Sequence, residues 1–137
     1  SGCLFFREET TMAEPTGEFS MKMTGHSEEA ISSGTRLTSY WEGTATGFGT
    51  VFGTLTVDLS HDDIAATSGT CRYVAVAYLA DGGRDAGAAE GTWTQHAGHN
   101  AWTLQLTGTT ASGQKIRSES EIDLAARSWT GKNFDAS

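Results

Sequence analysis

Apolar and polar residues alternate with a period of two along most of this chain, and this pattern constrains the fold more than any other feature. In the segment TVFGTLTVDL, residues 50–59, Val51, Leu55 and Val57 share one face and threonines occupy the other. Successive side chains of an extended strand point to opposite sides, so this period indicates half-buried β-strands. We therefore predict an all-β fold.

Glycine-containing turns separate these segments at nearly even spacing. The chain has 17 glycines and 1 proline, and GFG at 47–49 and DGG at 81–83 can adopt the positive φ angles of hairpin turns. This spacing predicts about eight strands. Because an open meander exposes two edges, we predict an eight-stranded antiparallel up-and-down β-barrel, with a two-sheet β-sandwich as the alternative. The segment HSEEAISSG, residues 26–34, is expected to be a connection with room for one turn of helix.

The 137 residues fit one domain, which we expect to span residues 17–134. Residues 1–16 are expected to be a flexible leader, and their CLFF run is too short for an export signal. We expect natural translation to begin at Met12. Glu8 and Glu9 would then be translated from a purine-rich ribosome-binding site.

The charge and cysteine content narrow the classes of partner. A net charge of −8 has the wrong sign for nucleic acid and for anionic lipid surfaces. No apolar run approaches the roughly 18 residues that span a bilayer, so no membrane partner is expected. Cys71 is predicted to be a small buried apolar residue, and pairing with Cys3 in the leader has little support. We therefore predict a cytoplasmic protein.

Two histidine-containing segments are candidates for a metal site. His96 and His99 share the glycine-containing segment HAGHN, which we interpret as a hairpin turn. Zinc sites need three or four ligands, and no cysteine lies near this pair in the sequence. His61 with Asp62 and Asp63 is better explained as a solvated polar loop. We expect no metal ion.

Catalytic motifs are also missing from the sequence. It contains no Gly-x-Ser-x-Gly elbow, and the glycines of GFGTVFG precede a strand rather than the helix that would hold a phosphate. Glu42, Glu119 and Glu121 could act as general acids or bases only if they were buried. No catalytic residue is assigned, and no cofactor is expected.

One segment, residues 71–79, is apolar on both faces. Cys71, Tyr73, Ala75, Ala77 and Leu79 form one face, and Val74, Val76 and Tyr78 form the other. A strand that is apolar on both faces has to be covered on both. We expect the face of Val74, Val76 and Tyr78 to be buried in a homo-oligomer or by the N-terminal segment.

The inward positions combine small residues with large aromatic ones. An eight-stranded barrel has an interior that is either filled by side chains or holds one small ligand. Small residues opposite aromatic ones leave a pocket unless they interdigitate. The residues predicted to line such a pocket are Trp41, Tyr73, Trp93, Trp102, Ser118 and Ser120.

The segments GEFSMKM at 17–23 and SSGTRLTSYWEGTATGFG at 32–49, with the glycine-bounded hairpins up to SWTG at 128–131, form a pattern that covers most of the chain after Met12. This pattern resembles the allene-oxide-cyclase-like group of small antiparallel barrels, which includes related uncharacterised bacterial families. The resemblance implies a barrel that is often oligomeric and that, in some members, binds or cyclises reactive apolar molecules. No catalytic residue is carried over, because no motif anchors one.

The expected function is binding of a small apolar or aromatic molecule inside the barrel. One alternative is a cofactor-independent cyclase or isomerase that uses the same pocket. The other is a structural or interaction module with a filled core. A cavity would favour the first two over the third, and turnover would separate the first two from each other.

Overall fold

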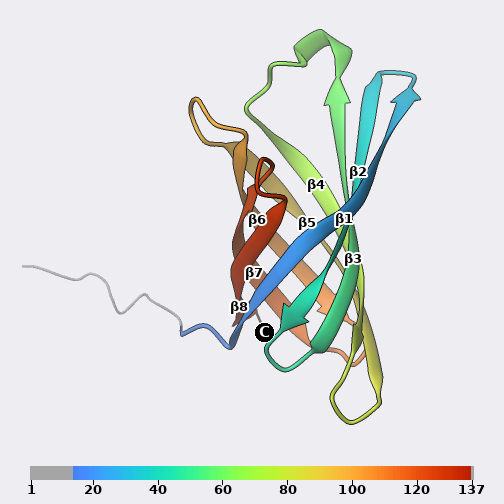
Figure 1. The fold of residues 1–137 in the computed structure, drawn as a ribbon, viewed down its shortest axis with the longest axis vertical. Helices are drawn as coiled ribbons and strands as arrows, with labels where there is room; N and C mark the ends of the chain where they lie inside the picture. Colours follow the sequence, from blue (N-terminus) through green and yellow to red (C-terminus); the bar gives the residue numbers. More distant parts are fainter. Residues whose placement is uncertain (1–13, 137) are drawn as a thin grey trace, which may run out of the picture.

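The computed structural model describes residues 14–136, which form a closed barrel of eight antiparallel strands (Figure 1). The strands are β1 (Gly17–Ile31), β2 (Gly34–Ala45), β3 (Gly49–Ser60), β4 (Ser68–Tyr78), β5 (Arg84–Gln95), β6 (Ala101–Thr110), β7 (Lys115–Asp123) and β8 (Ser128–Asp135). Each strand pairs with the next one, and β1 also pairs with β8. The predicted antiparallel barrel is confirmed. The expected start at Met12 lies outside the described residues.

The two ends of the barrel carry different connections (Figure 1). We call one end the terminal end. β1 begins there and β8 ends there, and the same end carries the β2–β3, β4–β5 and β6–β7 turns. The other four connections lie at the opposite end, the loop end. There the β1–β2 hairpin and the β3–β4 connection, with a short 3-10 helix over His61–Asp63, project beyond the other strands. No helix within residues 14–136 is long and apolar enough to cross a membrane.

β1 is longer than the sequence pattern predicts. Residues 25–31 pair with residues 34–40 of β2 after a register shift between Met23 and Gly25, so the expected connection over 26–34 is wrong. β8 pairs only with residues 17–22 of β1 and leaves the outer part of that strand as an edge. This edge carries Glu28, whose carboxylate forms a hydrogen bond with His26 Nδ1 at 2.6 Å. Charged side chains on an exposed edge oppose pairing with another chain.

The loop half of the interior is filled with large side chains. Trp41, Leu104, Ile122 and Trp129 are each no more than 1% exposed. Such close packing of large side chains leaves little room for a ligand among these residues. The space that remains in the interior therefore lies toward the terminal end.

A glycine on β3 makes room for one aromatic ring of the core. A Cβ atom at Gly53 would overlap the ring of Tyr73 on β4, so this position requires glycine. The Tyr73 ring can therefore lie against the β3 backbone.

Candidate functional site, an apolar cavity in the barrel

A cavity of about 140 Å³ lies inside the barrel near its terminal end. Its wall draws on all eight strands and on the β2–β3 turn. The larger side chains in this wall are Phe19, Met21, Phe48, Val51, Tyr73, Leu106, Ile116 and Trp129. The cavity is therefore almost entirely apolar, as small-molecule sites usually are.

Small residues on three neighbouring strands leave this space. Ala75 and Ala77 on β4, Gly87 and Ala89 on β5, and Gly108 on β6 all line the cavity. Toward the loop end, the inward positions of β5 and β6 carry Trp93 and Leu104 instead. The cavity therefore follows from an uneven distribution of side-chain size along the strands, and not from a gap in the sheet.

Trp129 separates the cavity from the packed half of the core. Its ring makes edge-to-face contacts with Phe19, Trp41 and Tyr73, at centroid distances of 5.8, 5.3 and 4.9 Å. Its indole Nε1 donates a hydrogen bond to Ser120 Oγ at 2.8 Å. The tryptophan is thus fixed from several sides and presents a rigid apolar wall to the cavity.

Two polar side chains lie next to each other in the cavity wall. Ser118 on β7 and Asn133 on β8 are register partners, and both line the cavity. Ser118 is only 8% exposed. Within residues 14–136, neither side chain has a hydrogen-bond partner. A ligand group placed between them would meet a free hydroxyl and a free amide.

The Tyr73 hydroxyl is another polar group of the wall, and it is already engaged. It donates a hydrogen bond to Met21 Sδ at 3.6 Å. Burial raises the pKa of Tyr73 well above its ordinary value, because desolvation disfavours the phenolate. Tyr73 therefore contributes a neutral, largely apolar surface.

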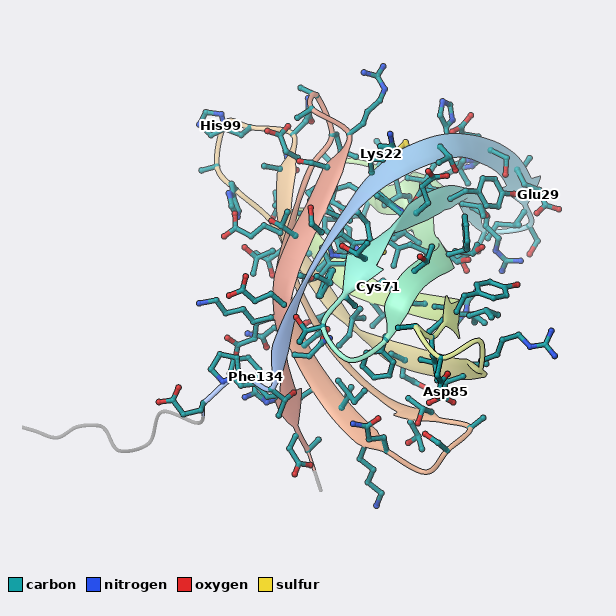
Figure 2. All side chains as sticks on the ribbon, turned by 60° about the horizontal axis from the view of Figure 1, so that its bottom comes forward. Lys22, Glu29, Cys71, Asp85, His99 and Phe134 are labelled. Carbon is teal, nitrogen blue, oxygen red and sulfur yellow. The ribbon has the colours of Figure 1, made fainter. Side chains whose placement is uncertain are left out.

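Asp85 lies at the rim of the cavity, by the β4–β5 hairpin (Figure 2). Its carboxylate accepts hydrogen bonds from Ser112 Oγ at 2.7 Å and from the backbone amides of Ser112 and Ala86 at 3.2 and 2.9 Å. The Ser112 hydroxyl, followed by these amides, lowers the pKa of Asp85. The carboxylate therefore ties β5 to the β6–β7 turn and is not a free base.

The structure separates the six residues predicted to line the pocket into two groups. Tyr73 and Ser118 line the cavity. The others lie outside its wall: Trp41, Trp93, Trp102 and Ser120. These four belong to the loop half, where each has a packing or hydrogen-bonding partner in the core.

The partners of these four residues explain their positions. Trp93 stacks on Trp102 with a centroid distance of 4.9 Å and an interplanar angle of 30°. Trp41 donates from Nε1 to Ser39 Oγ at 2.8 Å, and Ser120 accepts from Trp129. The three tryptophans are thus core residues of the packed half. The cavity is displaced from the predicted position toward the terminal end.

Sequence reasoning missed several cavity residues, including Trp129 and Asn133. In SWTGKNF, residues 128–134, Trp129 and Asn133 are four positions apart and so share one face of β8. The pairing of Asn133 with Ser118 depends on the β7–β8 register, which the sequence pattern did not define.

The histidines lie away from the cavity. His96 and His99 belong to the β5–β6 connection at the loop end, where Figure 2 shows His99 on the projecting turn. His96 Nε2 forms a hydrogen bond with Thr103 Oγ1 at 2.7 Å, and His61 Nε2 forms one with Thr35 Oγ1 at 3.2 Å. Within the described part of the chain, no group of three His, Cys, Asp or Glu side chains could hold a metal ion.

Cys71 is 2% exposed, and its burial raises the pKa of its thiol to about 11. The prediction that it is a small buried apolar residue is confirmed. A thiol with this pKa is almost entirely protonated near neutral pH and is a poor nucleophile.

Comparison of the chain with protein-family models, with curated proteins and with solved structures finds no match. The resemblance to the allene-oxide-cyclase-like group therefore stays a prediction. What the molecule can bind has to be inferred from its cavity.

Proposed function

We propose that this barrel binds one small, uncharged and largely apolar molecule in the cavity near its terminal end. The observation that carries this proposal is an apolar cavity of about 140 Å³. An engineered apolar cavity of roughly 150 Å³ in another protein binds benzene. A ligand built on one six-membered ring matches this space.

The paired side chains of Ser118 and Asn133 favour a ligand with one polar group. Both are free to form hydrogen bonds, and they face the cavity from neighbouring strands. A buried hydroxyl or carbonyl of the ligand would recover there the hydrogen bond that it loses to water. We therefore expect a phenol or a cyclic ketone to bind better than benzene.

The lining also favours a ligand without charge. Among residues 14–136, Asp85 is the only acidic or basic side chain that lines the cavity, and its carboxylate is held by the β6–β7 turn. Burial of an ion without a partner of opposite charge is strongly unfavourable. Charged molecules of the same size should bind far more weakly than neutral ones.

The alternative of a cyclase or isomerase has less support. General acid–base catalysis needs a group whose pKa lies near the working pH. In the described part of the chain, the titratable residues that line the cavity are Tyr73, with a raised pKa, and Asp85, with a lowered pKa. Binding without turnover therefore agrees better with the lining. A filled structural core agrees less well, because the cavity is present.

Titration with phenol and benzene tests the proposal. We expect phenol to shift the amide resonances of cavity residues in a protein NMR spectrum. Ala75→Leu adds three carbon atoms inside the cavity, and it should weaken phenol binding by about tenfold or more because the ligand and the new side chain compete for the same volume. Ser118→Ala should weaken the binding of phenol but not that of benzene.

Thr107→Leu is the matched control, because this exposed residue of β6 points away from the interior. It should bind phenol as the parent protein does. Equal affinities of Ala75→Leu and Thr107→Leu would show that phenol binds elsewhere, and the proposal would then fail.

A further inference from the structure

An apolar surface covers the outside of β2 to β5, and we propose that a second copy of this chain packs on it. This surface, the outer apolar face, consists of Tyr40, Phe52, Val74, Val76, Tyr78, Ala86 and Ala88. Val74 is 59% exposed, Phe52 48% and Tyr78 47%. Single exposed apolar residues are normal, but a contiguous group of them marks an interaction surface.

The strand register shows that the outer apolar face is continuous. Val76 pairs with Phe52 on one side and with Ala86 on the other. Val74 pairs with Ala88 in the adjacent row. The rings of Phe52 and Tyr78 also meet edge to face, with centroids 5.9 Å apart. These contacts join β3, β4 and β5 into one apolar surface, and Tyr40 on β2 lies beside it as the register partner of Thr54.

The outer apolar face ends at two opposite charges on β5. Their arrangement favours a second copy of this chain as the partner. The outward residues of β5 run in the order Arg84, Ala86, Ala88 and Glu90, so the strand is basic at one end and acidic at the other. A two-fold axis that crosses the strands between Ala86 and Ala88 reverses this order. It places Arg84 opposite Glu90 of the partner subunit, and the same contact occurs a second time by symmetry.

The same axis also makes β4 complementary to β4 of the partner subunit. Arg72 on β4 pairs with Glu90, and Tyr78 pairs with Arg84. The axis therefore also brings Arg72 toward Tyr78 of the partner subunit, where a guanidinium and an aromatic ring attract each other. Val74 then faces Val76 of the partner subunit at the centre.

The other simple arrangement is less favourable. An axis parallel to β4 would place Arg72 against Arg72 of the partner subunit, and like charges in contact oppose association. The crossed axis brings Arg84 opposite Glu90 of the partner subunit and Arg72 opposite Tyr78 of the partner subunit, so no like charges of β4 and β5 meet. The geometry therefore points to an antiparallel, face-to-face dimer.

A charge exchange tests this arrangement. Arg84 and Glu90 are six residues apart on one strand, or about 20 Å at the usual rise, so they do not pair within a chain. We expect the parent protein to sediment as a dimer. R84E and E90R should each dissociate, with the dimer weakened by about tenfold or more, because each variant places two like-charged pairs across the interface.

An equimolar mixture of R84E and E90R should form dimers again. In the mixed dimer every position 84 meets an opposite charge at position 90 of the other chain. The control is K132E, a charge reversal at an exposed residue of β8 far from the outer apolar face, and it should remain dimeric. Circular dichroism of each variant checks that the barrel is folded.

Several outcomes would overturn the proposal. A parent protein that sediments as a monomer at high concentration would show that no second copy covers this face. A dimer that survives Val74→Lys with Val76→Lys would place the interface elsewhere. If R84E and E90R dissociate but do not associate when mixed, the crossed two-fold arrangement is wrong.

Discussion

Ser118 and Ser120 show how two identical residues on one face of a strand acquire different roles. They lie two positions apart on β7 and are both buried, at 8% and 4% exposure. Ser120 accepts the indole hydrogen bond of Trp129 at 2.8 Å, whereas Ser118 meets the cavity. Their different surroundings follow from the strand register, which brings Trp129 close to one serine and Asn133 to the other.

Replacement of these serines by alanine should therefore have unequal effects on stability. Ser120→Ala leaves the buried Trp129 Nε1 without an acceptor and should lower the free energy of unfolding by about 1–3 kcal/mol. Ser118→Ala removes no protein hydrogen bond and should change it much less. Urea denaturation of both variants measures the difference, and equal losses would contradict the assigned roles.

The buried indole of Trp93 can be compared with the indole of Trp129 in the Ser120→Ala variant. Trp93 Nε1 is buried without a hydrogen-bond partner within the described residues, so the fold already contains one unsatisfied indole. The stacking of Trp93 on Trp102 helps to offset that cost.

The sequence predicts the face on which a residue lies better than its depth in the barrel. Alternation correctly places Trp41, Trp93 and Ser120 on inward positions, since all three are buried. It does not give the height of each position along the barrel, because height depends on the stagger between paired strands. Tyr73 and Ser118 therefore line the cavity, whereas equally inward residues of other strands lie in the packed half.

At the scale of the strands, the outer part of β1 was the least predictable element. The segment HSEEAI lacks the alternation that identified the other strands, because neither of its faces is deeply buried. It is extended because residues 34–40 of β2 supply backbone partners across a two-residue turn. Such pairing depends on the neighbouring strand and leaves little signal in the segment itself.

The β2–β3 pair contains an ion pair that makes a pH prediction possible. Arg36 donates two hydrogen bonds to Asp58, its register partner, at 2.8 and 3.1 Å. The hydrogen bond from Arg36, with the charge of its guanidinium, lowers the pKa of Asp58. A folded-state pKa below the unfolded value means that this stabilisation is present above the ordinary pKa of Asp. It is lost as the pH falls through the lowered value.

We therefore expect Asp58→Asn to be less stable than the parent protein near about pH 6, and the difference to shrink below about pH 4. The effect should be small, because both side chains are about one third exposed. Urea midpoints of both proteins at the two pH values provide the measurement. A difference that stays constant as the pH falls would show that Asp58 does not act through its charge.

On the scale of the whole molecule, the barrel consists of a packed half and a hollow half. Tryptophans fill the loop half, and alanines and glycines leave about 140 Å³ in the terminal half. Trp129 forms the boundary between them, with ring contacts to both sides. Because the packed half stabilises the fold, we expect the proposed ligand to enter the hollow half without reorganisation of the barrel.

The location of bound phenol tests the central claim most directly. Intermolecular nuclear Overhauser effects between the ring protons of phenol and the methyl groups of Ala75, Ala77 and Ala89 report a ligand inside the cavity, since these residues line it. We predict such effects in the parent protein and their loss in Ala75→Leu. Effects that appear only at methyl groups of the outer apolar face, such as those of Val74, or no effects at saturating phenol, would contradict the account.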